Sequence, residues 1–316
     1  MLTKPIQDLT GRTVRCILFD LGDTLWYRKD VASWHQLEVA SNQHAVTVLR
    51  QHGAPKFLPS INDAALGKRL REALEGEVRG IIHRDPEIEP NGPLAVVRVL
   101  QQWGIENVDL ALGEAIFEAL RIRIPASRPL FDDVLSTLAA LRQRGFQLGV
   151  VTNRLWGGEP FREDLQTLGL LNYFDLRHIA VSADLGVRKP NPAIFLHVLN
   201  EFQIPPEEAV MVGDSLRADI IGGQQLGIFS IWKPKPRWLD SINAHLGNHG
   251  TPAELAPGEI TEQLPPGVHV TDGDYVLAQV KSGDKRLEAF LRGDIKPDLI
   301  VEKLSDLLDI LSEVGK

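Results

Sequence analysis

CILFDLGDTL, which spans Cys16–Leu25, decides the fold of this chain. Its first four residues are apolar and predict a buried strand, which ends at the carboxylate of Asp20. Thr24 follows four residues later. A carboxylate at the point where a buried strand opens into a loop is suited to act as a nucleophile or as a metal ligand. The segment therefore predicts a strand that carries a functional aspartate at its carboxyl end.

The same pattern, an apolar run followed at once by polar residues, occurs twice more. Phe146–Val151 precedes Thr152, and Ala209–Val212 precedes Gly213-Asp214. Further strands are predicted at His178–Val181, Ile228–Trp232 and Pro297–Val301. Helical patterns lie at Val134–Arg144, Phe161–Leu168, Ala193–Phe202, Ala218–Leu226 and Leu304–Leu311. Continuously apolar strands that alternate with helices indicate an α/β fold, in which a parallel sheet has helices on both faces and binds ligands at the carboxyl ends of its strands.

Two stretches interrupt this alternation. Residues 26–127 contain helical patterns and no convincing strand, which predicts a separate helical lobe. Its helices are expected at Val31–Arg50, Ala64–His83, Pro93–Trp103 and Leu110–Arg121. Residues 233–296 form the second interruption and open with Lys233-Pro-Lys-Pro-Arg-Trp238, which we interpret as a stiff basic linker, with phosphate or partner binding at the functional edge of the sheet as the alternative. Within it, Gly267–Val270 and Tyr275–Val280 flank a Thr-Asp-Gly-Asp turn and predict a hairpin, so this stretch is expected to be a small α/β insert.

The composition excludes several classes of protein. The chain has 316 residues and a net charge of −8, which argues against a broad nucleic-acid surface. Its single cysteine, Cys16, excludes an internal disulfide and a cysteine-based zinc site, and we expect a buried, inert thiol. The amino terminus has no apolar signal core, and no run approaches the roughly 20 apolar residues that span a bilayer. We expect a cytoplasmic enzyme or binding protein, monomeric or homodimeric, without nucleic-acid or membrane partners.

The polar residues at the strand ends point to phosphate chemistry. Carboxylates of Asp20 and Asp214 that converge at one sheet edge would repel each other unless a cation joined them, and hard oxygen ligands favour Mg²⁺. Thr152 and Asn153 supply a hydroxyl and an amide for an anionic oxygen. Lys189 supplies a positive charge that can neutralise both nucleophile and substrate. Each of these residues alone is also common in helix caps and turns, so only the combination is informative.

In this order the motifs resemble those of the haloacid dehalogenase-like superfamily. That family has Asp-x-Asp-x-Thr, then a strand-end Thr or Ser, then Lys, then Gly-Asp-x-x-x-x-Asp. The matching residues here are Asp20 with Thr24, then Thr152, then Lys189, then Asp214 with Asp219. The resemblance implies a Rossmann-like catalytic core made of residues 1–25, 128–232 and 297–316. Residues 26–127 resemble the helical C1 cap of the family, whereas residues 233–296 are an additional insert of unknown role.

The resemblance also implies a mechanism. A Mg²⁺-dependent hydrolase of this family would act on a small phosphorylated metabolite, with Asp20 attacking phosphorus to form an aspartyl-phosphate that water then cleaves. The implied metal site comprises Asp20, the backbone carbonyl of Gly22, Asp214, and Asp219, which would steady Lys189 or a metal-bound water. Thr152 would bind the transferred group, and Lys189 would orient and neutralise it. Further candidates for substrate contact are Thr24, Asn153, Arg154 and Trp156.

One position departs from the family pattern. Family phosphatases place a second aspartate two residues after the nucleophile, and that residue protonates the leaving group and then activates water. This chain has Gly22 there, and Asp23 follows it without changing the spacing from Asp20 to Thr24. Adjacent residues need not point the same way, so Asp23 or a residue of the cap is a candidate for the proton transfer. General acid–base help is worth on the order of 10²–10⁴ in rate.

Three functions follow from this departure. The first is a phosphatase that prefers good leaving groups or uses Asp23 or a cap residue as its acid. The second is a 2-haloacid dehalogenase, because halide leaves without a proton, although the metal-binding form of Gly213-Asp214 argues against a metal-free enzyme. The third is a non-catalytic relative that binds a phosphate or a protein, with the insert at 233–296 as its interaction surface.

Overall fold

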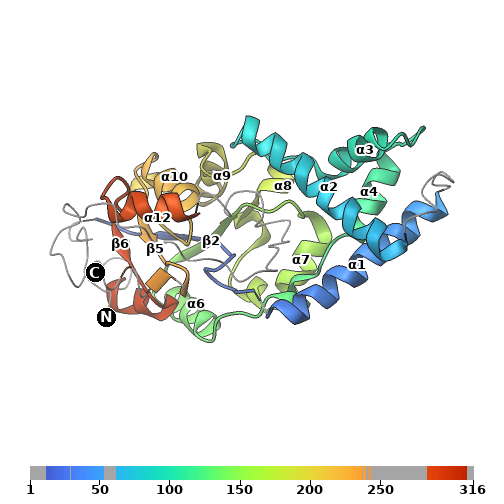
Figure 1. Ribbon diagram of the computed structural model, residues 1–316. Coiled ribbons are helices and arrows are strands. Elements are labelled where there is room, and N and C mark those ends of the chain that lie inside the picture. The colour runs from blue at the N-terminus through green and yellow to red at the C-terminus, as the bar shows by residue number, and fades with distance from the viewer. Residues whose placement is uncertain are drawn as a thin grey trace.

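The core of the molecule is a six-stranded, wholly parallel sheet in the order β3-β2-β1-β4-β5-β6 (Figure 1). The computed structural model describes residues 12–28, 30–52, 62–236, 238, 239, 242 and 283–311. Its strands are β1 Cys16–Phe19, β2 Gln147–Thr152, β3 Ile179–Val181, β4 Ala209–Gly213, β5 Phe229–Trp232 and β6 Leu299–Ile300. The predicted α/β fold with a parallel sheet is therefore confirmed. The hairpin predicted at 267–280 lies outside the described residues.

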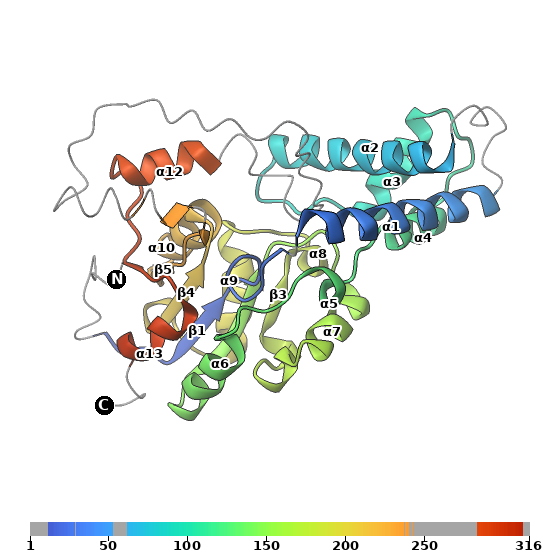
Figure 2. The ribbon, with the colours of Figure 1, turned by 60° about the horizontal axis from the view of Figure 1, so that its bottom comes forward.

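Helices cover both faces of this sheet (Figure 2). Those that follow the core strands are α6 Val134–Gln143, α7 Gly158–Thr167, α8 Ser182–Leu185, α9 Pro192–Phe202, α10 Gly222–Gln224, α12 Gly283–Leu291 and α13 Leu307–Ile310. Short 3-10 turns are η1 Leu170–Asn172, η2 Leu176–His178, η3 Pro206–Glu208 and η5 Leu304–Asp306, whereas η4 Leu216–Ile221 is π-helical. Side chains of α6, α7 and α13 pack in one hydrophobic cluster on one face, and those of α9 pack in another on the opposite face.

The alternation of side chains along β1 explains why it is apolar throughout. Successive side chains of a strand point to opposite faces of the sheet. Ile17 and Phe19 belong to the cluster under α6 and α7, whereas Cys16 and Leu18 belong to the cluster under α9. Burial raises the pKa of the Cys16 thiol, which confirms the expected buried and unreactive cysteine.

The predicted helical lobe consists of α1 Val31–Gln51, α2 Asp63–Arg84, α3 Gly92–Gln102 and α4 Leu110–Ala119, and the short α5 Ile124–Ser127 leads back to the core. An Asp or Asn side chain precedes each long helix and accepts a hydrogen bond from a backbone N–H of the first turn. These caps are Asp30, Asn62, Asn91 and Asp109. The four helices enclose a hydrophobic cluster of their own, with Leu70, Val96 and Ile116 almost fully buried. The cap-forming residues and the 3.6-residue pattern therefore account for the lobe.

Three predicted helices differ from those observed, and α7 starts three residues before the expected Phe161. The helix expected at Ala218–Leu226 starts earlier, as η4, because the Ser215 hydroxyl accepts a hydrogen bond from the backbone N–H of Ala218 at 3.1 Å. The closing helix expected at Leu304–Leu311 divides into η5 and α13. The start of η4 shows that a side-chain cap rather than apolar periodicity fixes the first residue, whereas the closing helix starts at Leu304 as predicted and differs in its 3-10 first turn.

We expect Gly149→Ala to lower the free energy of unfolding by about 1–3 kcal/mol. Gly149 lies in β2 directly under α9, and a Cβ there would be 2.6 Å from Cγ1 of Val198 and 3.0 Å from Cδ2 of Leu18. Gly76→Ala is the matched control, since Gly76 lies in α2 and a Cβ there meets nothing within 4 Å. That variant should gain about 0.5–1 kcal/mol from helix propensity. Equilibrium unfolding in guanidinium chloride measures both, and equal effects of the two would contradict the close packing at β2.

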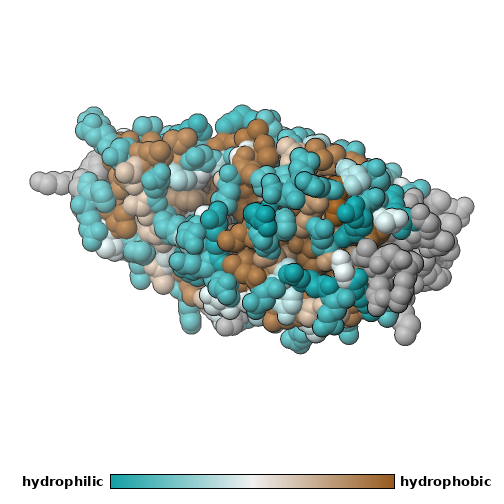
Figure 3. Space-filling view, turned by 180° about the vertical axis from the view of Figure 1, so that it is seen from behind, coloured by the Kyte–Doolittle hydropathy of each residue, from teal (hydrophilic) through white to brown (hydrophobic). Residues whose placement is uncertain are grey.

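The surface mixes hydrophilic residues with smaller hydrophobic areas on the face shown in Figure 3. The large hydrophobic side chains that are exposed come from separate parts of the described chain: Tyr27, Ile88, Leu94, Leu110, Leu135 and Leu176. Within the described ranges, no helix has both the length and the hydropathy needed to cross a bilayer.

Candidate active site

The residues predicted to be functional meet at the carboxyl edge of the sheet. β1 pairs with β2 on one side and with β4 on the other, so the loops after these three strands leave the sheet together. They border a cavity of about 120 Å³. The predicted residues that line it are Asp20, Gly22, Thr152, Asn153, Arg154, Lys189, Asp214 and Asp219. Asp23 and Thr24 do not line this cavity.

Lys189 is the centre of the polar contacts. Its ammonium group donates hydrogen bonds to Oδ1 of Asp20 at 2.7 Å and to Oδ1 of Asp219 at 2.6 Å. The third partner is the carbonyl oxygen of Val151 at 2.6 Å. Burial alone would lower the pKa of Lys189, but the charges of Asp20 and Asp219 outweigh it and the pKa is raised. Lys189 is therefore a permanent cation that fixes Asp20 at the end of β1.

Asn153 holds the backbone of Lys189 in place. Its Nδ2 donates to the carbonyl oxygen of Lys189 at 3.0 Å, and its Oδ1 accepts from the backbone N–H of Lys189 at 2.8 Å. Asp219 is fixed in a similar way, because its Oδ2 accepts from the backbone N–H of Ser215 at 2.8 Å. A Cβ at Gly213 would lie 2.2 Å from Oδ2 of Asp219, which explains the glycine at the end of β4. Lys189 and Asp219 are thus held in place before any ligand binds.

Three buried carboxylates could hold a divalent cation. Asp20, Asp214 and Asp219 each offer an oxygen, and these atoms all lie within 4.8 Å of one another. Burial raises the pKa of Asp214 to about 8, although the positive charge of Lys235 acts in the opposite direction. Oδ2 of Asp214 is buried beside the ammonium group of Lys235, at 3.2 Å. All three candidate ligands are hard carboxylate oxygens, so this oxygen-rich site fits a divalent metal such as Mg²⁺.

Lys235 brings a second ammonium group to this cluster. It lies 3.0 Å from Oδ2 of Asp23 and 3.2 Å from Oδ2 of Asp214, and its side chain is buried. Lys233 adds a hydrogen bond of 3.3 Å to the main-chain carbonyl of Asp23, and its ammonium lies 3.8 Å from the centre of the Phe131 ring. Residues 233–235 therefore return to the site, in line with the alternative role of this basic segment at the sheet edge rather than with a linker alone. The signal was available, since they directly follow β5, the neighbour of β4.

Asp23 and Thr24 face this second lysine and the protein interior. Asp23 has a φ of +53°, a left-handed conformation that Asp tolerates better than most residues. Thr24 is fully buried, and its Oγ1 has no hydrogen-bond partner among the residues that the structure describes. Neither residue lines the cavity that contains Asp20.

Arginines dominate the remainder of the cavity wall. Arg154 lies with its guanidinium 4.6 Å from the centre of the Phe161 ring, and it lines the cavity as predicted. Four further arginines also line the cavity and were missed by the sequence analysis: Arg128, Arg188, Arg217 and Arg286. For two of them the sequence held a signal, because Arg188 precedes Lys189 and Arg217 lies inside the motif Gly213–Asp219.

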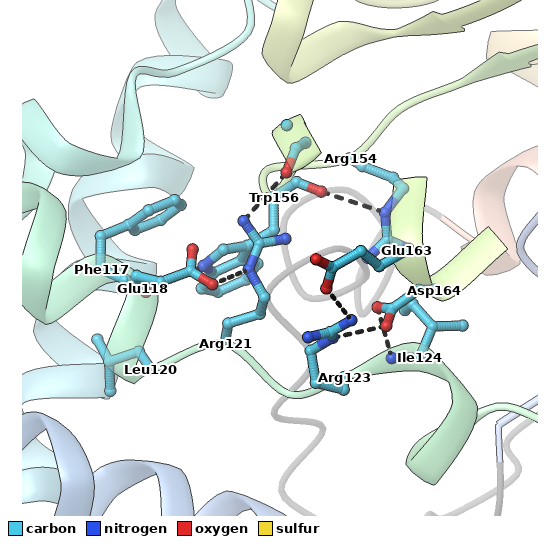
Figure 4. A network of polar contacts seen from close by, with 12 residues as sticks. Phe117, Glu118, Leu120, Arg121, Arg123, Ile124, Arg154, Trp156, Glu163 and Asp164 are labelled. Carbon is cyan, nitrogen blue, oxygen red and sulfur yellow. Dashed lines mark hydrogen bonds and ion pairs between the residues drawn. The ribbon is translucent and has the colours of Figure 1, made fainter. Parts of the chain in front are cut away.

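Trp156 belongs to the junction between the helical lobe and the core rather than to the cavity (Figure 4). Its indole N–H donates to the carbonyl oxygen of Phe117 at 3.1 Å, and the two rings stack with centres 4.8 Å apart. Beside it, Arg123 donates to Asp164 at 2.6 Å and to Glu163 at 3.0 Å. These contacts tie the end of α4 and the start of α5 to α7.

A second junction closes the other side of the cavity. Ile88 forms an antiparallel bridge with Val187, two residues before Lys189. The Arg188 guanidinium lies 3.5 Å from a carboxylate oxygen of Glu89 and both side chains are buried. Ile82 and Pro86 of the lobe line the cavity opposite the strand ends. The lobe thus contributes one wall of the site.

Comparison with known proteins agrees with these motifs. A family model described as haloacid dehalogenase-like hydrolase matches residues 14–227. The glyceraldehyde 3-phosphate phosphatase of Pyrococcus abyssi is 36% identical over 226 residues, which cover 69% of this chain and 81% of that protein. The enzyme of the same name from Methanopyrus kandleri is 27% identical over 231 residues, which cover 72% of this chain and 87% of that protein. Among solved structures, a 2-haloacid dehalogenase from Pseudomonas syringae aligns with 94% of this chain and 97% of its own, at 22% identity and a TM-score of 0.49. Because the family model spans more than half of the sequence, the chain belongs to the haloacid dehalogenase-like hydrolases.

Proposed function

We propose that the protein is a Mg²⁺-dependent phosphatase that acts on a small phosphorylated substrate. The observation that carries this proposal is the arrangement around Lys189, which joins Asp20 to Asp219 beside the buried Asp214. A nucleophile, a fixed cation and a metal-binding carboxylate therefore border one cavity. The named phosphatases among the relatives support the same class of reaction.

In this proposal each side chain has one task. The Oδ2 atom of Asp20 attacks phosphorus, because its Oδ1 atom is already bonded to Lys189. Thr152 at the end of β2 donates its hydroxyl to the transferred phosphoryl group, and Arg154 supplies positive charge on the same wall. Asn153 acts through Lys189, whose backbone it holds. Water then attacks the phosphorus of the aspartyl-phosphate and regenerates the carboxylate.

The metal ligands in this proposal are Asp20, Asp214 and the main-chain carbonyl of Gly22, and Asp219 supports them through Lys189. Bound Mg²⁺ would neutralise phosphate oxygens and orient them for in-line attack. The lobe of α1–α4 is proposed to act as a cap that sets substrate choice, since Ile82 and Pro86 reach the cavity. Glyceraldehyde 3-phosphate is the alkyl ester to test first, because four relatives are named for it.

The test is a Mg²⁺-dependent assay on p-nitrophenyl phosphate and on a panel of phosphorylated metabolites that includes glyceraldehyde 3-phosphate. Phosphate release that needs Mg²⁺ and stops with EDTA is the expected result. Halide release from 2-haloacids without a metal would instead establish a dehalogenase. Silence on both panels, with retained Mg²⁺ binding, would establish a non-catalytic relative.

We expect Lys235→Met to make the stability of the protein depend on Mg²⁺. Removing one partner of a buried ion pair leaves the charge on Asp214 uncompensated, which costs about 3–5 kcal/mol. A divalent cation offsets that charge, so Mg²⁺ should raise the melting temperature of the variant more than that of the parent protein. Thermal unfolding in EDTA and in excess Mg²⁺ measures both.

Lys233→Met is the matched control for that experiment. Lys233 is equally buried, but its ammonium contacts a carbonyl oxygen and an aromatic ring rather than a carboxylate. It should lose stability without a larger response to Mg²⁺. An equal response of the two lysine variants would show that Lys235 has no special relation to the metal site.

A further inference from the structure

Arg217 and Arg286 reach the cavity from two different parts of the chain. Arg217 belongs to η4, between Asp214 and Asp219, whereas Arg286 belongs to α12, near the end of the additional insert. Both line the cavity that also contains Asp20. The insert therefore contributes a cation to the candidate active site, although the family model ends at residue 227.

A hydrophobic contact between α12 and η4 fixes this position. Leu287, which follows Arg286, packs in one buried cluster with Leu216, which precedes Arg217. Phe290 of α12 extends the cluster to Trp232 at the end of β5, with ring centres 4.8 Å apart. The two arginines are thus adjacent to a buried apolar contact that holds their backbones together.

Within the described residues, these two arginines have no neutralising partner. Both arginine side chains are half-buried, and neither forms a hydrogen bond or ion pair with any residue in the described part of the chain. Burial lowers the pKa of Arg286, and repulsion from Arg217 lowers it further. By contrast, Arg188 on the same cavity wall is paired with Glu89. Two like charges held together, with no counter-charge bonded to them among the residues that the structure describes, indicate a site for an anion.

The other unusual feature of the cavity is the composition of its acids. Among the described residues that line it, the carboxylates are Asp20, Asp214 and Asp219, and all three belong to the nucleophile and metal cluster. Gly22 stands where a general acid would be expected, and Asp23 is paired with Lys235 outside the cavity. The described lining is therefore rich in positive charge, and each of its acids already has a role in the nucleophile and metal cluster.

We propose that the substrate is a phosphoric anhydride, and that Arg217 and Arg286 bind its anionic leaving group. The inference rests on the phosphatase function proposed above. An anhydride leaving group departs as a phosphate or carboxylate anion and needs no proton. A pair of fixed guanidinium groups stabilises the negative charge of that anion, just as a proton from a general acid neutralises an alkoxide. An anhydride substrate thus accounts both for the two arginines that have no partner among the described residues and for the glycine where a general acid would be expected.

The chemical step balances without a general acid. For a diphosphate, a bond forms between Oδ2 of Asp20 and the terminal phosphorus, and the bond from that phosphorus to the bridging oxygen breaks. Its electron pair stays on the leaving phosphate, which carries two negative charges and remains between Arg217 and Arg286. Water then attacks the phosphorus of the aspartyl-phosphate, the carboxylate of Asp20 departs with the bonding pair, and both protons of the water remain on the released phosphate.

The experiment compares substrates that differ in the type of leaving group and, independently, in whether they carry a second anionic group. Inorganic pyrophosphate and acetyl phosphate are anhydrides with phosphate and carboxylate leaving groups. Glycerol 1-phosphate and 2-phosphoglycolate release an alkoxide, and the latter also carries a second anion. p-Nitrophenyl phosphate needs no acid and has no second anion. In Mg²⁺, we expect kcat/KM for at least one anhydride to exceed that for both alkyl esters by about 10²-fold or more.

Variants of the two arginines complete the test. Arg217→Gln and Arg286→Gln should each lower kcat/KM for the preferred anhydride by about 10- to 100-fold and that for p-nitrophenyl phosphate by less than about threefold. Arg292→Gln is the matched control, because Arg292 directly follows α12, is exposed and pairs with Asp294 at 3.0 Å. Its activity should not change, and melting temperatures check the fold of all three variants.

The outcomes distinguish this inference from the function on which it rests. Faster hydrolysis of 2-phosphoglycolate than of either anhydride, or equal losses on p-nitrophenyl phosphate and anhydride in the arginine variants, would overturn the anhydride assignment while the phosphatase stands. Absence of any Mg²⁺-dependent hydrolysis, p-nitrophenyl phosphate included, would overturn the phosphatase proposal itself. Preference for pyrophosphate over acetyl phosphate identifies the leaving group as a phosphate, and the reverse identifies a carboxylate.

Discussion

Replacing Asp20 with Asn is expected to lower kcat for phosphate release by at least about 10³-fold. The amide keeps the shape of the side chain but is a far weaker nucleophile than the carboxylate, so no aspartyl-phosphate can form. The fold should survive, because Lys189 retains its bonds to Asp219 and to the carbonyl of Val151. Loss of one of several clustered negative charges also relieves the repulsion that raises the pKa of Asp214.

Two measurements separate loss of chemistry from loss of structure. Steady-state hydrolysis of p-nitrophenyl phosphate gives the rate, and the melting temperature with and without Mg²⁺ reports on the fold and on the metal site. Intact-mass analysis of an acid-quenched reaction should show a phosphoryl group on the parent protein and none on Asp20→Asn. If the variant keeps its turnover, or if the phosphoryl group is found on another residue, Asp20 is not the nucleophile.

The edge of the sheet that carries the candidate site was predictable because it depends on local sequence patterns. A strand buried on both faces must be apolar along its whole length, so β1 and the position of Asp20 follow from Cys16–Phe19 alone. Parallel neighbours then bring Thr152 and Asp214 to the same edge. Lys189 was placed by the family motif, and its bonds to Asp20 and Asp219 agree with that placement.

The residues that sequence analysis missed reach the site through tertiary packing. Lys235 follows a strand end, but only the turn of the chain after β5 brings it to Asp23 and Asp214. Arg286 is separated from Trp232 by more than 50 residues of sequence, and only the packing of Leu287 against η4 carries it to the cavity. No periodicity or spacing encodes such a contact, because it depends on how two surfaces fit together. Asp23 shows the converse, because the sequence makes it a candidate general acid whereas the fold pairs its carboxylate with Lys235.

The second large effect is expected from Gly22→Asp, which should raise kcat/KM for alkyl phosphate esters by about 10²-fold or more. The backbone at Gly22 accepts a side chain, since its φ is not in the left-handed region and a Cβ there has Oδ2 of Asp20 as its nearest neighbour, at 3.9 Å. The new carboxyl group would therefore project into the cavity beside the nucleophile. Glycerol 1-phosphate is the substrate of choice, because its alkoxide leaving group has the greatest need of a proton.

The gain in kcat/KM should be largest for the leaving groups that most need a proton, and this dependence can be tested directly. p-Nitrophenyl phosphate and the anhydrides leave without a proton, so Gly22→Asp should change their rates by less than about tenfold, and the advantage of anhydrides over alkyl esters should shrink. Gly22→Asn is the matched control, since it adds the same bulk and no acid, and it should give no gain on glycerol 1-phosphate. Asp23→Asn tests the remaining candidate. If Asp23→Asn removes activity on alkyl esters and Gly22→Asp adds none, Asp23 leaves Lys235 to transfer the proton, and the acid that the sequence lacks at Gly22 is supplied one residue later.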